Sequence, residues 1–560
     1  AAGHTVHREY YINDGVNSEQ MRLFAESVRA LFLGDDFPEK GYKGDYVQGV
    51  ADFLDTSDFE WRQAIEMELS NLYFHLERLR KLGETEEAFK GYDPSRLRIP
   101  EIEAFAEALR ERKSSSVPVR ELMPTSDTAL SYTVWQRASQ LAMLEKQRVD
   151  LEVFGVTFDT WFSEQSLHDN GAVQAELEEL ESSKAADENP YRLKLKLAKG
   201  GKVEDVENED QAAIKAEEGD EEIATTGDSP TVWLRSTKFG DDMDRVLKRR
   251  DGRLTYIASD VAYHKDKFNR PADGDKLITV LGPDHHGYIG RLTAVVAAML
   301  LADGQVQVAP SDEPLSEIDA KIYTSAEERD RCRAATALAR EKLDVQIFQI
   351  VRFVKDGKPA PMRKRDGNIY ALIDLVNEIG AKARPSGTTE EKQAAGRDVA
   401  RFFYLMRHHD TAMDFDLDLA EKQSDENPVF YAQYAHARIC SVLDKAAEAG
   451  FPAAVPSDAS DPLWNLLVEP KEKTLALKVL DLRYEVARCA EDYAVNRLTT
   501  YAVELARTYH AFYDACRVIQ PDQPELSKAR VALCAATRSG LRAVFNLLGI
   551  GAPDRMEREA

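Results

Sequence analysis

The chain has 560 residues, with 73 basic against 98 acidic side chains, so its net charge at pH 7 is −25. Its 43% hydrophobic content can bury several cores, which excludes disorder throughout, and its length suggests about three or four domains, at roughly one per 150 residues. The longest mainly apolar stretch, residues 292–302, is shorter than the ~20 residues of a membrane-spanning helix. These features predict a soluble, cytoplasmic protein that acts at no membrane.

The N-terminal part of the sequence begins as an α/β unit. Residues 5–12 are rich in β-branched and aromatic types, an Asn-Asp-Gly turn follows, and residues 19–33 have helical periodicity. From residue 36 to about residue 148 the apolar residues recur at helical spacing. The sequence therefore predicts a strand and a helix within residues 1–35, followed by a mainly helical insertion at 36–157.

Two polar segments interrupt the next part of the chain. Between Lys202 and Glu222 there are ten acidic residues, two basic residues and no aromatic one. Like charges at this density bury too little apolar area to offset the cost of ordering, so we expect residues 187–228 to form a solvated loop, with an interaction surface as the alternative. Residues 312–330 are expected to be a second surface insertion.

The α/β alternation resumes beyond the acidic segment and ends before the C-terminal third. Strand-like runs at residues 231–236, 277–281 and 345–354 alternate with helical patterns at 260–268 and 290–302. From residue 399 onward no convincing strand occurs. The amphipathic helices expected there, which predict an all-α domain at 399–560, are at 431–448, 474–494 and 498–513.

The five cysteines are widely spaced and form no C-x-x-C pair. His436 and Cys440 lie one helical turn apart, but no further ligand is evident beside them, so neither disulfides nor a protein-bound metal is expected. The acidic balance argues against a large non-specific nucleic-acid coat, although a local basic groove on an acidic body is compatible with it. We expect no DNA partner.

Two segments lie at strand-to-helix junctions, where a parallel sheet binds ligands. Gly282 to Gly287, G-P-D-H-H-G, places two imidazoles and a carboxylate between glycines, which suits a nucleotide site; a polar turn and a metal pair are the alternatives. Tyr256 and Asp260 stand at i, i+4 in T-Y-I-A-S-D, where Asp260 could pair with a cationic substrate. The alternative for Asp260 is a helix N-cap.

Two further groups carry suitable chemistry. Three cations lie beside Gly367 in the segment 361–368, and cations stabilise the charge that builds on phosphate oxygens as pyrophosphate leaves; an ordinary basic surface loop is the alternative. Tyr431, Tyr434 and Arg438 fall on one helical face, which suits the stacking of unpaired bases but also ordinary core packing.

Nine segments, in this order, resemble bacterial arginyl-tRNA synthetases, a family of class I aminoacyl-tRNA synthetases. Because the matches spread over nearly the whole chain, they are far more specific together than singly. They are R-E-Y-Y-I-N-D-G at 8–15, G-Y-K-G-D-Y at 41–46, F-D-T-W-F-S-E-Q-S-L at 158–167, R-S-T-K-F-G-D-D-M-D-R-V-L at 235–247, L-T-Y-I-A-S-D-V-A-Y-H at 254–264, G-P-D-H-H-G-Y at 282–288, D-F-D-L-D-L-A at 414–420, E-N-P-V-F-Y-A-Q-Y-A-H-A-R at 426–438 and G-I-G-A-P-D-R-M at 549–556.

The resemblance implies an arginine–tRNA ligase with a Rossmann catalytic domain, whose second half we place at 158–398, and a helical anticodon-binding domain at 399–560. It implies that arginine attacks ATP, with Mg²⁺ present, and that the arginyl group then passes to tRNA(Arg). In such enzymes even the first step needs tRNA. The residues that it implies are Tyr256, Asp260 and Asp284 for arginine; Gly282, His285, His286, Met362 and the catalytic Lys364 for ATP; and Tyr431, Tyr434, Arg438 and Met556 for the anticodon loop.

Three features depart from the family pattern. The H-I-G-H-type ATP signature belongs before Ala1, so we expect a truncated chain whose Rossmann domain lacks its start. In the signature loop, usually K-M-S-K-R, Pro361 and Arg363 replace the first lysine and the serine. The two polar insertions are not predicted by the family. A non-catalytic tRNA-binding paralogue or assembly partner is therefore the rival hypothesis; in either case we expect a monomer.

Overall fold

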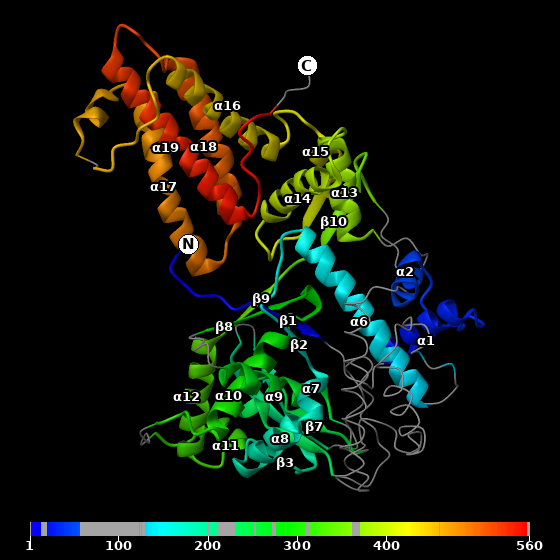
Figure 1. The fold of residues 1–560 in the computed structure, drawn as a ribbon. Coiled ribbons are helices and arrows are strands. Elements are labelled where there is room, and N and C mark those ends of the chain that lie inside the picture. The colour runs from blue at the N-terminus through cyan, green and yellow to red at the C-terminus, as the bar shows by residue number, and fades with distance from the viewer. Residues whose placement is uncertain are drawn as a thin grey trace.

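The structure is a computed structural model of the chain. In the part of the chain that it describes there are three hydrophobic cores: one in an α/β body, one in a helical insertion and one in a C-terminal helical region (Figure 1). The residues that it describes are 2–12, 19–55, 123, 125, 129–198, 201–210, 230–250, 252, 254–270, 276–285, 287–308, 313–360, 370–458 and 460–556.

The described part of the α/β body, at the bottom of Figure 1, contains parallel strand pairs and a three-stranded antiparallel sheet. Its elements are β1 (Glu9–Ile12), β2 (Thr160–Ser163), α7 (Gln165–Asp169), α8 (Ala172–Ser182), β3 (Ala186–Asp187), β6 (Val232–Leu234), η1 (Ser236–Phe239), β7 (Arg245–Lys248), α9 (Tyr256–Phe268), β8 (Leu277–Leu281), η2 (Pro283–His285), α10 (Tyr288–Ala302), α11 (Asp319–Ile322), α12 (Ala326–Lys342) and β9 (Leu343–Ile347). β1 pairs with β2, Glu9 opposite Thr160, and β8 pairs with β9, Leu277 opposite Leu343. The strand predicted at 277–281 is confirmed. The buried middle of α10, an almost wholly apolar helix, lies in the core of this body.

The acidic insertion is partly ordered, contrary to expectation. β4 (Tyr191–Leu197) and β5 (Val203–Asp210) form an antiparallel hairpin in which basic residues of β4 face acidic residues of β5. Arg192 Nε donates to Glu209 Oε2 at 3.0 Å, and Lys196 Nζ lies 2.5 Å from Glu207 Oε1. The prediction of a loop was wrong here because the cations that compensate the acidic run lie upstream of it, on the partner strand. Residues 211–229 lie outside the described part.

The polar segment 312–330 is also not a plain surface insertion. It contains α11 and the start of α12, whose N-cap residue Ser325 accepts a hydrogen bond from the Glu328 backbone at 3.1 Å. Arg329 of α12 is buried and donates to the Pro314 carbonyl at 3.1 Å, which holds the preceding chain against the helix. Helix formation was missed because capping and burial, rather than apolar periodicity, stabilise this segment.

The helical insertion has a core of its own. α1 (Glu19–Leu33), α2 (Asp45–Leu54) and α6 (Ala129–Val153) pack around Trp135, which is fully buried and meets Phe32 edge-on at 5.1 Å. The predicted helix at 19–33 is confirmed, but it shares this core rather than that of the α/β body. The part of the insertion that the structure describes is helical, and residues 56–122 lie outside the description.

The C-terminal region contains a small sheet as well as helices. Its elements are β10 (Val351–Lys355), β11 (Lys358–Pro359), α13 (Leu372–Ala383), α14 (Thr389–Leu405), β12 (Met413–Asp416), α15 (Leu417–Glu421), α16 (Pro428–Glu448), η3 (Pro462–Leu466), α17 (Pro470–Asp492), α18 (Asn496–Ala515) and α19 (Pro524–Leu548). The strand expected at 345–354 is in fact two strands, β9 and β10, in different sheets. β12 lies beyond residue 399, where no strand was expected, and buries Phe415 beside Phe353 of β10. Four residues are too short a signal for period-two alternation.

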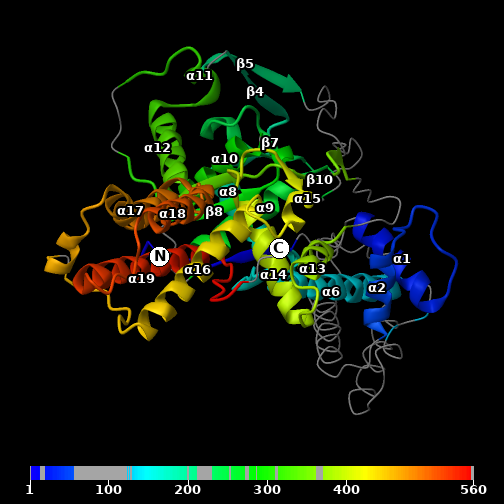
Figure 2. The same ribbon diagram turned by 90° about the horizontal axis from the view of Figure 1, so that it is seen from above.

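Helices α16 to α19 form a bundle, which lies on the far side of α13 and α14 from the helical insertion (Figures 1 and 2). The predicted boundary at residue 399 falls inside α14. Local chemistry sets the ends of these helices: the side chain of Asn427 caps α16 with Pro428 in its first turn, and Gly549 ends α19 at φ 67°.

The C-terminal helix α19 is longer and more apolar than the 292–302 stretch noted in the sequence. By length and composition it could cross a membrane, and 61% of its most apolar window is buried inside the structure. Leu541, Val544 and Phe545 are fully buried in the core shared with α16, α17 and α18. Packing at the centre of the bundle accounts for its composition.

Candidate functional site

Asp260 lies inside helix α9 and does not cap it. The helix begins at Tyr256, with Thr255 as its N-cap residue, so Asp260 stands in the second turn, on the same face as Tyr256. The N-cap interpretation of Asp260 is therefore wrong. Its Oδ2 atom accepts a hydrogen bond from the hydroxyl of Tyr288, the first residue of α10. A side chain of the 282–288 segment thus meets the candidate carboxylate.

The electrostatics of Asp260 set it apart from an ordinary surface carboxylate. Burial raises the pKa of Asp260 to about 6, against the opposing influence of the Tyr288 hydrogen bond and of the charges on Lys267 and Arg291. Burial also lowers the pKa of Lys267 to about 8, and its ammonium lies 4.0 Å over the ring of Tyr263. A half-buried carboxylate whose pKa is raised in this way is typical of functional sites.

The first strand, β1, contacts α9 through a partly buried polar network. Glu9 of β1 accepts a hydrogen bond from the Tyr263 hydroxyl and is ion-paired with Arg270. Arg270 also donates to Asp266 at 2.8 Å, and the ring of Tyr11 lies 4.3 Å from that of Tyr263. Residues of the R-E-Y-Y-I segment, to which the sequence assigned no role, therefore hold the helix that carries Asp260.

For the other predicted residues of this site that it describes, the structure gives a position on or next to an element but no side-chain contact to Asp260. Gly282 directly follows β8, and Asp284 and His285 lie in η2, where the Asp284 side chain is exposed. Tyr256 is 59% exposed at the start of α9. The structure therefore brings the two segments together through Tyr288. Three of the predicted residues, His286, Met362 and Lys364, lie outside the described residues.

The predicted anticodon residues form a row with α18. Tyr431 and Tyr434 lie 5.3 and 6.3 Å, ring to ring, from His510, and the Arg438 guanidinium lies 4.3 Å over the ring of Tyr513. All three predicted side chains are half-buried, so each has both a packed and an open side. His510 and Tyr513 were not predicted from the sequence, although their i, i+3 spacing places them on one face of α18.

The C-terminal tail, residues 549–556, is held by polar contacts to α14 and α16. The Gly551 amide donates to Asp398 Oδ2 at 2.9 Å, and Gln433 Nε2 donates to the same oxygen and to the Gly551 carbonyl, both at 2.9 Å. Arg401 Nε donates to the Leu548 carbonyl at 3.0 Å, where α19 ends. The tail that carries Met556 is thus fixed to α16, the helix of Tyr434.

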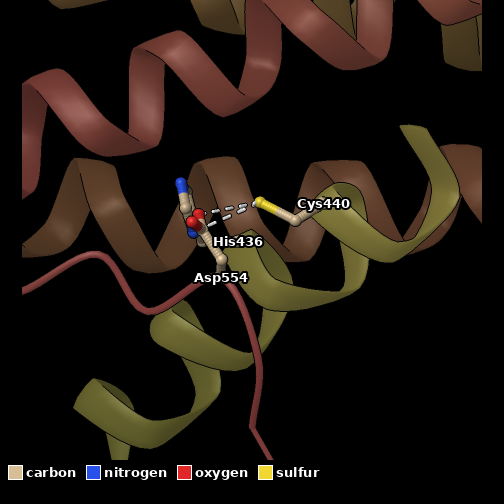
Figure 3. Close-up of side chains that lie close together, drawn as sticks. All are labelled: His436, Cys440 and Asp554. Atoms are coloured by element: carbon tan, nitrogen blue, oxygen red, sulfur yellow. Dashed lines mark hydrogen bonds between the residues drawn. The ribbon is translucent and has the colours of Figure 1, made fainter. Parts of the chain in front are cut away.

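Figure 3 shows His436 and Cys440 of α16 facing Asp554 of the tail. Their donor atoms lie within 4.8 Å of one another, a spacing that a metal ion could use. A metal requires a thiolate and an unprotonated nitrogen. However, burial and Asp554 raise the pKa of Cys440 to about 11, its Sγ lies 3.4 Å from Asp554 Oδ1, and His436 Nδ1 lies 3.0 Å from the Pro553 carbonyl. We therefore interpret the cluster as a hydrogen-bonded latch for the tail, which the sequence missed because Asp554 is far away along the chain.

Known proteins are similar to this chain over nearly its whole length. Residues 432–556 match the DALR anticodon binding domain. Over 99% of its length the chain is 34% identical to the arginine–tRNA ligase of Heliobacterium modesticaldum and 32% identical to that of Bacillus subtilis, and it covers 72% of each. The chain belongs to the arginine–tRNA ligase family. The recognition based on nine segments is confirmed, and none of these similarities favours the rival paralogue.

Solved structures of arginyl-tRNA synthetases share the fold. The crystal structure of a Campylobacter jejuni protein described as an arginyl-tRNA synthetase matches with a TM-score of 0.60 and 23% identity, and the match covers 99% of this chain and 86% of the other. The enzyme of Thermus thermophilus matches with a TM-score of 0.51 and 19% identity, covering 98% and 83%. The predicted fold class, a Rossmann-type catalytic domain with a helical anticodon-binding domain, is confirmed, as is ligase function. Arginine, ATP and tRNA are the substrates of the family.

Proposed function

We propose that this ligase binds the guanidinium of arginine at the junction of α9, η2 and α10, with Asp260 as its main contact. The observation that carries the proposal is the half-buried Asp260 carboxylate, hydrogen-bonded to Tyr288 and one helical turn from the exposed Tyr256. A desolvated carboxylate is costly unless a cation meets it, and a guanidinium can donate two parallel hydrogen bonds to its oxygens. Tyr256 and Asp284 would complete the arginine pocket.

We place ATP beside this pocket, at the carboxyl end of β8. Gly282, His285 and His286 would line the nucleotide, with Met362 and Lys364 closing over its phosphates. Mg²⁺ would arrive with ATP, and we propose no protein ligand for it. The arginine carboxylate would attack the α-phosphate, and Lys364 would stabilise the charge that builds on the leaving pyrophosphate. The arginyl group would then pass from the adenylate to the 3′ end of tRNA(Arg).

We further propose that Tyr431, Tyr434, Arg438 and Met556 meet the anticodon loop. Three of them lie along α16, half-buried against α18, and the latched tail carries the fourth. Rings with one packed face and one open side suit the stacking of splayed bases, which proteins read in single-stranded loops. The enzyme would act in the cytoplasm as a monomer, with tRNA rather than DNA as its nucleic-acid partner.

Arginine affinity should fall at acid pH if Asp260 binds the guanidinium. Only the ionised carboxylate pairs with the cation, and the pKa of Asp260 is raised to about 6. Below pH 6 the apparent dissociation constant of arginine should therefore rise about tenfold per pH unit, while above pH 7 it should be flat. Calorimetric titration with arginine between pH 5 and 8 measures this. A constant affinity down to pH 5 would contradict the role proposed for Asp260.

The Tyr434→Ala substitution tests the anticodon contact. Loss of one stacked base should weaken binding of an arginine-tRNA anticodon stem-loop by roughly 1 to 3 kcal/mol, whereas loss of a core aromatic costs about 3 to 5 kcal/mol of folding stability. Loop affinity and the urea midpoint are measured on the same variant. Tyr509→Ala, at a fully buried position of α18, is the control that shows how far the urea midpoint falls when a core aromatic is lost. A large fall in midpoint with unaltered loop affinity would assign Tyr434 to the core.

A further inference from the structure

Tyr288 occupies a particular position between the two halves of the proposed arginine pocket. It is the first residue of α10, directly after the G-P-D-H-H-G segment, and its hydroxyl donates to Asp260 Oδ2 on α9. Its ring packs against the core of the α/β body, and the guanidinium of Arg291 lies 5.0 Å from the ring centroid. The ring is therefore held in place independently of the hydroxyl.

The hydrogen bond leaves the carboxylate able to bind a guanidinium. Each carboxylate oxygen carries two lone-pair sites, and a guanidinium that binds in the fork arrangement uses one on each oxygen. Tyr288 occupies one site on Oδ2 of Asp260, so among the described residues one site on Oδ2 and both sites on Oδ1 are left for other donors. A single donor on one oxygen fixes the orientation of the carboxylate without competing for the fork.

Other charged and titratable groups around Asp260 make such orientation necessary. Lys267 on the same helix and Arg291 on α10 both attract the carboxylate, and Tyr11 of β1 also interacts with it electrostatically. A carboxylate free to rotate would turn toward these internal cations, which would then compete with the cation of the substrate. The Tyr288 hydroxyl provides the directional contact that opposes this rotation.

We propose that Tyr288 is a positioning residue of the ligase, which aims the Asp260 carboxylate at the guanidinium of arginine and keeps it from turning to Lys267 and Arg291. The proposal rests on the proposed function of Asp260 as the arginine contact. It concerns the hydroxyl alone, because the ring has its own packing. Tyr288→Phe removes that hydroxyl and leaves the ring in place.

Two changes are expected in Tyr288→Phe. The arginine dissociation constant at pH 7.5 should rise roughly ten- to a hundredfold, which is the range for one hydrogen bond to a charged group. The pH midpoint of arginine binding should also move upward, because a hydrogen bond to the ionised carboxylate favours ionisation and its loss disfavours it. The urea midpoint at pH 7 should fall only slightly, because the ring packing is kept while the further rise in the pKa of Asp260 costs some folding stability. Calorimetric arginine titrations between pH 5 and 8.5 and urea unfolding measure all three.

The matched control is Tyr323→Phe. Tyr323 is another tyrosine of the same core, and its hydroxyl donates to the Lys238 carbonyl at 3.0 Å, so the control removes a comparable hydrogen bond. It should change neither arginine affinity nor the pH midpoint. An unaltered dissociation constant in Tyr288→Phe, or a weaker affinity without any shift of the pH midpoint, would overturn the inference.

The Asp260→Asn variant separates this inference from the function on which it rests. If Asp260→Asn loses arginine binding while Tyr288→Phe behaves like the parent chain, the pocket stands and the role of Tyr288 fails. If Asp260→Asn binds arginine as the parent chain does, the pocket itself is wrong, and the inference fails with it. If both variants lose arginine affinity and the pH midpoint moves upward in Tyr288→Phe, the pocket and the role of Tyr288 are both supported.

Discussion

Asp260→Asn is expected to weaken arginine binding by about 2 to 5 kcal/mol, the largest effect of a single substitution in the proposed pocket. The asparagine keeps the size of the side chain and can still accept the Tyr288 hydrogen bond, but it leaves the guanidinium of the substrate without its counter-charge. Titration of the chain with arginine at pH 7.5 measures the loss. An unchanged dissociation constant would remove Asp260 from the pocket.

The same substitution should stabilise the folded chain at pH 7. The pKa of Asp260 is raised to about 6 in the folded state, above the ~3.9 of an unfolded aspartate, so the folded state binds the proton more tightly. The free energy of unfolding therefore falls by up to about 3 kcal/mol as the pH rises from about 4 to 6. An asparagine at this position carries no charge and avoids this loss. We expect a higher urea midpoint for Asp260→Asn at pH 7 and no difference below pH 4.

The control for Asp260→Asn is Asp266→Asn, a substitution further along the same helix. Asp266 is paired with Arg270 at the surface side of the network, and its side chain is 40% exposed. This variant should bind arginine like the parent chain and should gain no stability at pH 7. If both variants lost arginine binding equally, the effect would belong to helix α9 as a whole rather than to the Asp260 carboxylate.

Arg530→Met is expected to destabilise the helical bundle by about 3 to 5 kcal/mol. Arg530 of α19 pairs with Glu472 of α17, Nε to Oε1 at 2.7 Å, and the two side chains are 6% and 0% exposed. Removing the guanidinium leaves the buried Glu472 carboxylate without its counter-charge, with the Glu469 backbone amide as a remaining donor, and this costs more than the pair itself contributes. Urea or thermal unfolding of the full chain, followed by circular dichroism, measures the change.

Two further variants show whether the unpaired charge causes this loss. Glu472→Gln combined with Arg530→Met removes both charges and should recover much of the stability. Lys528→Met, which breaks the exposed pair of Lys528 with Glu525 on the same helix, should change stability by no more than about 1 kcal/mol. An Arg530→Met variant within about 1 kcal/mol of the parent chain would mean that water reaches this pair.

Sequence periodicity located elements whose signal is local. The helix at 19–33 and the strand at 277–281 were predicted with the bounds that they have, because apolar spacing and turn residues mark both ends. Where the signal depends on a distant partner, the prediction was wrong. The charges of β5 are compensated by those of β4 and by Lys321, and β12 is a strand through its parallel pairing with β10, where Phe415 packs beside Phe353.

By itself, the sequence determined the family and the succession of an α/β part and a mainly helical part, and it predicted a site around Tyr256 and Asp260, because ordered motifs and local spacing are properties of the chain alone. Only the tertiary structure decided that Asp260 is bonded to Tyr288 rather than capping α9, and that Asp554 meets His436. The physical reason is that these contacts, and the burial that raises the pKa of Asp260 to about 6, depend on elements packed against one another, which residue spacing along one chain does not specify.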